Sequence, residues 1–223
     1  RNDSFWGVRC EAVKVLSTSK NKAVTEVYMK NMIDERDSRV RRTYLLQLGT
    51  LLNNHLEEKE NTAVLQYFLT NLIANETSYY SAADAVTALS DILAVDKIYD
   101  AVIPYIEMDS HVDIIRRSVL TALAKSKDSR AKDVFLKYGE TGTTARVRNI
   151  AISGLDVYLS DPKVIEFLNS KLFETPRSTQ GVVLGLLEKA KDPSSLPLLT
   201  KLMESSNDVR FKERINKVIQ AYN

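Results

Sequence analysis

The feature that most constrains this sequence is a short pattern of apolar residues that recurs along its length. Each clear copy begins with an aliphatic residue followed by arginine, and mostly apolar side chains stand four, five and eight positions later. Four copies keep this register closely, and they begin at Val8, Val40, Ile115 and Val147. Because these positions share one face of an α-helix, each copy predicts an amphipathic helix with a buried stripe.

Three weaker copies extend the pattern. Two begin at Ser81 and Thr179, and the third, over residues 208–219, is displaced by about one residue, as terminal copies often are. Neighbouring copies begin roughly 30 to 40 residues apart, which is an interval typical of helical repeat proteins.

The intervals between copies predict a second set of helices, one in each interval. We expect them at residues 23–33, 62–73, 97–106, 131–138, 162–173 and 195–203. Asp161 and Asp192 each precede a proline, an arrangement typical of a helix start. The helices of the repeated pattern are expected to begin at polar capping residues: Asp37, Ser110, Thr143 and Asn207. No stretch alternates apolar and polar residues over the length of a strand, so no sheet is predicted.

Paired helices at this interval predict an all-α fold, an α-solenoid of about six to seven helical pairs. We expect residues 1–223 to form a single repeat domain of this kind. The aliphatic-arginine step, the alanine four positions into some copies and the acid in the preceding turn resemble HEAT-like repeats of the short bacterial and archaeal kind. Tetratricopeptide repeats have a similar length, but their Trp, Gly, Tyr and Pro positions do not recur here.

Composition narrows the choice of partner and compartment. The 223 residues carry 31 basic and 29 acidic side chains, a net charge of +2, so no strong field draws the chain toward nucleic acid or a membrane surface. We recognise no signal peptide and no run of about 18 apolar residues. The single cysteine rules out an internal disulfide and fits a reducing compartment. We therefore expect a cytoplasmic protein that binds neither nucleic acid nor membrane.

The arginines of the repeated step are the first candidate functional residues. Arg9, Arg41, Arg116 and Arg148 occupy one repeat position near the start of a helix. In one interpretation each guanidinium bonds an acid or a carbonyl of a neighbouring turn and forms a structural ladder. In the other, Arg41, Arg116 and Arg148 contact an acidic peptide or a phosphate backbone. Further arginines would reinforce such a stripe: Arg39, Arg42, Arg117, Arg146, Arg210 and Arg214.

Aromatic residues give little support to a nucleic-acid enzyme. HEAT-like alkylpurine DNA glycosylases are of similar size, but they stack an exposed base on aromatic residues of a basic face. Here most aromatic residues are tyrosines at helix-packing intervals, and the only tryptophan is in the first helix. Tyr79 and Tyr80 are compatible with an aromatic surface for a partner or with packing between repeats, and the helix start favours packing.

The sequence shows no assembled active site or metal site. His55 and His111 are its only histidines and lie far apart, and the His-Glu-x-x-His pattern of zinc peptidases is absent. Cys10 has no histidine beside it and is expected to be a buried thiol. The glycines of residues 139–144 lack the Gly-Lys-Ser/Thr end of a phosphate loop, so we expect a turn in which Gly139 ends a helix.

The first helix carries a family resemblance. Residues 3–16 are Asp-Ser-Phe-Trp-Gly-Val-Arg-Cys-Glu-Ala-Val-Lys-Val-Leu, and residues 5–9 are the most specific part. This segment resembles one in the C-terminal helical region of aminopeptidase N-like zinc metallopeptidases, in which HEAT-like repeats follow the catalytic part. Ser4, Cys10 and Val13 depart from that pattern without disturbing the helix face.

The resemblance implies a non-catalytic C-terminal domain of a zinc aminopeptidase-related hydrolase, which would close the peptidase cleft. Zinc would belong to an upstream catalytic domain, and no cofactor is expected in residues 1–223. That domain would be the partner, and Phe5 and Trp6 would form the inter-domain contact. Arg41, Arg116 and Arg148 would then suit the carboxylate of a peptide substrate.

The repeat register adds one expectation and leaves one alternative open. The first predicted helix is the second of its pair, so the chain is expected to begin in the middle of a repeat. The alternative function comes from a different class: a stand-alone HEAT-repeat scaffold that holds another protein in its groove.

Overall fold

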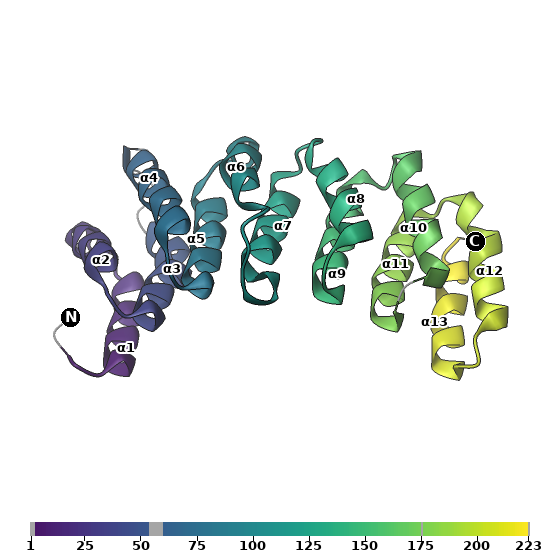
Figure 1. Ribbon diagram of the computed structural model, residues 1–223, viewed down its shortest axis with the longest axis horizontal. Helices are drawn as coiled ribbons and strands as arrows, with labels where there is room; N and C mark the ends of the chain where they lie inside the picture. The colour runs from purple at the N-terminus through teal and green to yellow at the C-terminus, as the bar shows by residue number, and fades with distance from the viewer. Residues whose placement is uncertain (1–2, 54–59, 175, 223) are drawn as a thin grey trace. The chain divides into compact units, whose positions relative to one another are not determined.

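The computed structural model describes residues 3–53, 60–174 and 176–222 and contains only helices and turns in these ranges (Figure 1). The predicted all-α helical repeat fold is confirmed. Internal contacts divide the chain into two compact units, Arg1–Ser126 (unit 1) and Lys127–Asn223 (unit 2). Each unit has its own core, and the single domain over residues 1–223 stays a prediction.

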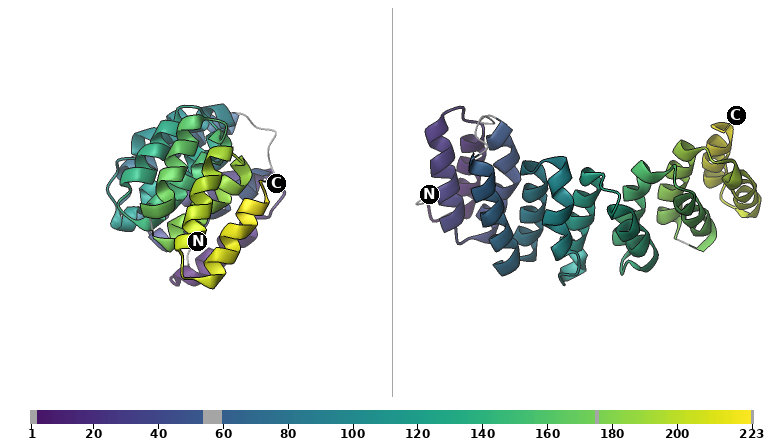
Figure 2. Two further views of the ribbon diagram at one scale, coloured as in Figure 1. Left: turned by 90° about the vertical axis from the view of Figure 1, so that its right-hand side faces the viewer. Right: turned by 90° about the horizontal axis from the view of Figure 1, so that it is seen from above.

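Unit 1 contains seven α-helices among its described residues. They are α1 (Trp6–Ser17), α2 (Lys22–Asp34), α3 (Ser38–Asn53), α4 (Glu60–Asn75), α5 (Tyr79–Ile92), α6 (Val95–Val102) and α7 (Ile114–Ser126). The odd-numbered helices form one row, in which α1 contacts α3, α3 contacts α5 and α5 contacts α7 (Figures 1 and 2). Each even-numbered helix packs on the odd-numbered helix that follows it, so unit 1 repeats a helical pair.

The predicted apolar stripes form the core of unit 1. Val40 and Ile115 are each 1% exposed, and the residues five positions after the start of each copy are buried throughout. Val8 differs, with 51% of its surface exposed. The physical difference is that α1 has only α2 and α3 as its main neighbours, whereas α3 also packs against α5.

Unit 2 repeats the same arrangement. Its helices are α8 (Ala131–Thr141), α9 (Ala145–Gly154), α10 (Pro162–Glu174), α11 (Arg177–Ala190), α12 (Leu196–Ser205) and α13 (Val209–Gln220). The pairs are α8 with α9, α10 with α11 and α12 with α13, and the odd-numbered helices again contact one another in order. All six helices predicted between the copies are therefore present in the two units.

Two predicted helix starts are shifted by one residue. The side chain of Thr144, and not Thr143, accepts a hydrogen bond from the N–H of Val147 at 3.2 Å and begins α9. Asp208, and not Asn207, accepts from the N–H of Phe211 at 3.2 Å and begins α13. In both cases the chosen oxygen reaches the free N–H three residues on, which is the geometry that a capping residue needs.

The prediction that Gly139 ends a helix is wrong. Helix α8 continues to Thr141, and its cap is Gly142, whose N–H donates to the carbonyl of Tyr138 at 3.0 Å. Gly139 lies inside the helix, where an added Cβ would lie 2.9 Å from the ring of Phe167. The glycine is required there by close packing and not by a turn.

None of the described helices combines the length and the apolar character needed to cross a membrane.

Candidate interaction surface

The arginines of the repeated step are held by acids and carbonyls of neighbouring turns. Arg9 Nε and Nη2 donate to the two carboxylate oxygens of Glu35 at 3.2 and 3.3 Å. Arg41 makes the same two-pronged contact with Glu76 at 2.7 and 2.8 Å. Arg41 also donates to the carbonyl of Glu35 at 2.7 Å, so successive rungs are linked.

The other two arginines of this position bond to residues that lie within ten positions of them in the sequence. Arg116 Nε donates to the carbonyl of Ile106 at 3.0 Å, and its Nη1 pairs with Asp113. Arg148 Nη1 donates to the carbonyl of Gly142 at 2.6 Å. Each of the four arginines therefore bonds an acid or a carbonyl of a neighbouring turn, as the structural interpretation predicted. Three of them lie in unit 1, and Arg148 lies in unit 2.

Glu76 shows how closely a rung is fitted. Burial alone would raise the pKa of its carboxyl, but hydrogen bonds from Arg41 and from the N–H of Ser78 outweigh burial and lower the pKa. The side chain of Glu76 is only 3% exposed, and that of Arg41 is 13% exposed. Contact of Arg41, Arg116 or Arg148 with a partner stays a prediction, and their internal bonds favour the structural role.

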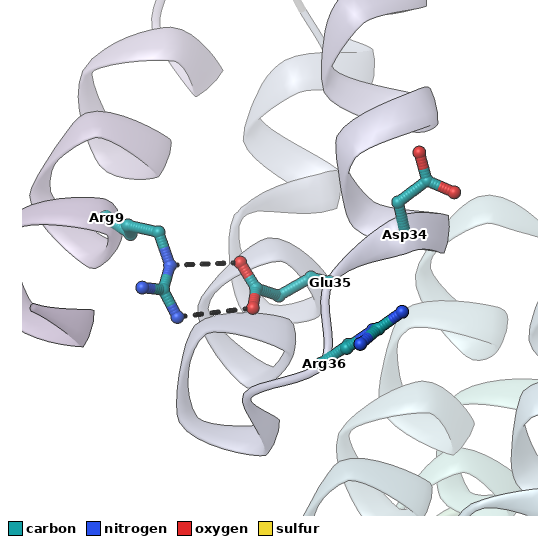
Figure 3. A pocket seen from close by; sticks show the side chains of 4 residues that line it. All are labelled: Arg9, Asp34, Glu35 and Arg36. Atoms are coloured by element: carbon teal, nitrogen blue, oxygen red, sulfur yellow. Dashed lines mark hydrogen bonds and ion pairs between the residues drawn. The ribbon is translucent and has the colours of Figure 1, made fainter. Parts of the chain in front are cut away.

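A pocket of about 420 Å³ lies beside the first rung and is lined by Arg9, Asp34, Glu35 and Arg36. Figure 3 shows that Glu35 points toward Arg9, whereas Asp34 and Arg36 extend away from that pair. Arg9 and Glu35 neutralise each other, so these two side chains have a structural role in the ladder and need no ligand in the pocket.

Arginines and aromatic rings stack in pairs on the exposed starts of α1, α3 and α5. The guanidinium of Arg39 lies 4.4 Å from the centre of the Trp6 ring, and that of Arg42 lies 5.0 Å from the centre of the Tyr80 ring. Tyr79 and Tyr80 are 48% and 44% exposed. We call the five residues Trp6, Arg39, Arg42, Tyr79 and Tyr80 the aromatic–arginine surface.

Acidic residues hold both stacked arginines in place. Asp37 accepts from Arg39 Nε at 3.0 Å and from Nη2 at 2.7 Å. Asp84 accepts from Arg42 Nε at 2.6 Å. Burial raises the pKa of Asp84, and the bond from Arg42 only partly opposes that effect. Each guanidinium is thus fixed at one edge and stacked on its face, an arrangement that suits arginine and not lysine.

The sequence located part of this surface. It singled out Arg39, Arg42 and Trp6, and for Tyr79 and Tyr80 it favoured packing between repeats over a partner surface. Both rings are about half exposed, and Tyr80 also stacks on Arg42 of the neighbouring helical pair. The stacked pairs join residues more than thirty positions apart. The signal that could have found them is the repeat register, which places the starts of α1, α3 and α5 side by side.

The histidines and the cysteine are the remaining residues that the sequence analysis considered for chemistry. Among the described residues no group of three or more His, Cys, Asp or Glu could hold a metal ion. His111 is exposed, and His55 lies outside the described residues. Cys10 is buried, as predicted, and its sulfur accepts from the hydroxyl of Thr43 at 3.2 Å.

The titration of Asp37 tests whether its carboxylate holds Arg39 in place. The side-chain hydrogen bond from Arg39 lowers the pKa of Asp37 from 3.8 to about 2. A depressed folded pKa stabilises the protein above the ordinary value, and this contribution is lost as the pH falls from 3.8 toward 2. This contribution to stability should be small, because the arginine of the pair is largely exposed and water screens its charge.

In an NMR titration of the Asp37 carboxyl carbon, we expect a midpoint near pH 2. Arg39→Gln should move that midpoint up toward 3.8, because it removes the largest cause of the shift. It should also change the fluorescence of Trp6, the single tryptophan. A midpoint that does not move in Arg39→Gln would show that Asp37 does not hold Arg39.

Comparisons with known proteins support the fold. No family model matches the sequence, and no curated protein matches it. Among solved structures, a chain of the complex of CpcE and CpcF of phycocyanin lyase from Nostoc sp. PCC7120 matches with a TM-score of 0.55 and 17% identity. The match covers 100% of this chain and 91% of that chain. At this identity the likeness concerns the fold alone.

The predicted membership of the aminopeptidase N-like family is wrong. Neither comparison of sequences finds such a relative, and the structural match over the whole chain is to a phycocyanin lyase component. A role as the cleft-closing domain of a zinc hydrolase, with an upstream catalytic domain as partner, is therefore withdrawn. The helical repeat fold is compatible with the alternative of a HEAT-repeat scaffold.

Proposed function

We propose that this chain is a helical-repeat interaction protein, and that it binds another protein through the aromatic–arginine surface of unit 1. The observation that carries the proposal is the pair of stacked, acid-pinned arginines, Arg39 on Trp6 and Arg42 on Tyr80. Tryptophan, tyrosine and arginine are the residues that most often dominate the binding energy of protein interfaces.

The arrangement of the surface supports binding in two ways. Its rings are rigid and partly exposed, so they can be covered by a partner without a large loss of side-chain freedom. Its guanidiniums already have fixed orientations, and each keeps N–H groups that face away from its acid. A partner that offers carbonyls or carboxylates over apolar atoms would satisfy both parts of this surface.

The structural neighbour supports a protein as the ligand. CpcE and CpcF are described together in a complex, so a fold of this kind is compatible with binding a second polypeptide. Phycocyanin lyase activity is a property of that neighbour, and we do not carry it to this chain. The proposal needs no metal and no cofactor.

The proposal predicts that binding depends on Trp6 and Tyr80. A photo-crosslinking amino acid at Tyr79 should capture a protein from an extract of the source organism, and the same amino acid at Tyr67, which is 75% exposed on α4, should not. The captured protein is then purified and its Kd measured. Trp6→Ala combined with Tyr80→Ala should weaken binding about 30-fold or more, because each ring is expected to contribute about 1 to 2 kcal/mol.

The control variant is Tyr67→Ala, which removes a more exposed ring from a different surface. It should leave the Kd within about twofold. Equal weakening by the control variant, or binding that survives loss of both Trp6 and Tyr80, would refute the proposed site. Thermal unfolding of each variant checks that unit 1 remains folded.

A further inference from the structure

Unit 2 carries four basic side chains that lie near one another without forming ion pairs among the described residues. Arg177 lies at the start of α11, and Arg210, Arg214 and Lys217 lie on α13, which contacts α11. All four are exposed, and among the described residues none of them forms an ion pair with an acid. This distinguishes them from Arg41, whose charge is neutralised by a carboxylate.

Two of these arginines are positioned by unusual contacts. The guanidinium of Arg177 lies 3.6 Å from the centre of the Phe211 ring, which itself is only 7% exposed. Arg214 Nη2 donates to the carbonyl of Gly181 at 2.8 Å. An added Cβ at Gly181 would lie 3.2 Å from Arg214 Nη1, so the absence of a side chain at that position leaves room for the guanidinium.

The two fixed guanidiniums lie close to each other along the contact between α11 and α13. Arg177 and Gly181 are four residues apart, so they stand on one face of α11, about 6 Å apart. The guanidinium of Arg177 lies on Phe211, three residues before Arg214 on α13, and Arg214 bonds Gly181, so we infer that the two guanidiniums lie roughly one helical turn apart. Arg210 and Lys217 lie one turn to either side of Arg214 on α13, which has four basic residues and only one acid, Glu213.

We propose that this cluster, Arg177, Arg210, Arg214 and Lys217, binds an acidic segment of a partner protein in an extended conformation. Alternate residues of an extended chain point to the same side about 6 to 7 Å apart, which agrees with the inferred spacing of about one helical turn between the two guanidiniums. Carboxylates at alternate positions would each meet a planar guanidinium with unused N–H groups. The charges of Arg210 and Lys217 extend the site by one turn in each direction.

Nucleic acid fits this cluster less well than a polypeptide. Base stacking on single strands needs exposed aromatic faces, but Phe211 is buried and its ring is already covered by Arg177. A polypeptide with carboxylate side chains is therefore the better ligand, because the cluster offers two oriented guanidiniums and two flanking positive charges. This site adds a second surface to the proposed function and can fail or succeed independently of the surface on unit 1.

The test uses the full chain and a fluorescent peptide of about twelve residues in which Asp and Ser alternate. Fluorescence anisotropy at low salt should show binding of this peptide, weaker binding as salt is added, and no binding of the matching Asn-Ser peptide. Arg177→Gln with Arg214→Gln should weaken the Kd about tenfold or more. Gly181→Ala should weaken it by a smaller factor, because it displaces Arg214 without removing a charge.

The control removes the same charge from a different place. Lys163 and Lys201 are exposed on α10 and α12, and Lys163→Gln with Lys201→Gln should change the Kd less than about twofold. If both double variants weakened peptide binding equally, the effect would come from net charge alone, and the proposed site would be wrong. Failure of the acidic peptide to bind, or tighter binding of a single-stranded oligonucleotide of equal charge, would also overturn it. Neither result would bear on crosslinking at Tyr79.

Discussion

Arg41→Met is expected to lower the free energy of unfolding by roughly 3 to 5 kcal/mol, because it leaves a buried carboxylate without its partner. The side chain of Glu76 is 3% exposed and receives both of its strongest bonds from Arg41, at 2.7 and 2.8 Å. Methionine fills most of the space of the arginine stem, so the loss should reflect charge and not a cavity. Urea unfolding followed by circular dichroism measures the difference.

Two companion variants separate the ladder from surface electrostatics. Arg41→Met with Glu76→Met should recover much of the lost stability, because replacement of both members of a buried pair by apolar residues is often tolerated. Arg39→Met, which breaks an ion pair whose arginine side chain is 56% exposed, should change the free energy of unfolding far less than Arg41→Met. If Arg41→Met cost no more than Arg39→Met, the ladder would have no structural weight and a binding role for Arg41 would gain support.

Most of the fold was predictable because the repeat pattern records burial directly. Apolar residues at helical spacing identified the core positions of α3, α7 and α9, and the intervals between copies located all six partner helices. Helix ends were less certain because neighbouring residues such as Thr143 and Thr144 are equally able to cap. Only the backbone geometry selects which oxygen reaches the free N–H.

The candidate surface was harder to predict because its contacts cross between helices. Nothing in the sequence near Arg42 shows that its guanidinium meets both Tyr80 and Asp84 on α5. The exposure of Tyr79 and Tyr80 is equally hard to predict from the sequence, because a tyrosine at a helix start can lie between repeats or face solvent. The repeat register brings the starts of the odd-numbered helices side by side, but the contact between α3 and α5 is needed to pair Arg42 with Tyr80.

The mistaken family assignment has a similar cause. The segment that suggested it is short, and four of its five specific residues have a local role in this fold. Phe5 covers Gly7, where an added Cβ would lie 2.7 Å from the ring, Trp6 stacks on Arg39, and Arg9 joins the ladder. Because these contacts lie within unit 1, they account for the segment without reference to a catalytic domain.

In unit 2, Phe135→Ala is expected to lower the free energy of unfolding by roughly 3 to 5 kcal/mol through the cavity it leaves. Phe135 is fully buried, and its ring packs against Gly154 and lies 6.3 Å from the centre of the Tyr158 ring. The matched control is Phe173→Ala, which removes the same ring from a position that is 43% exposed and should cost roughly 1 to 2 kcal/mol, less than Phe135→Ala. Urea unfolding again measures both.

Gly154→Ala tests the same packing from the opposite side. Its added Cβ would lie 2.5 Å from two ring carbons of Phe135, and a fully buried ring has little room to move, so a loss of about 1 to 3 kcal/mol is expected. A smaller side chain at position 135 should relieve this clash. Gly154→Ala should therefore cost less in the background of Phe135→Leu than in the natural sequence. Additive losses would show that the two positions are not in contact, and the described packing of α8 against α9 would then be wrong.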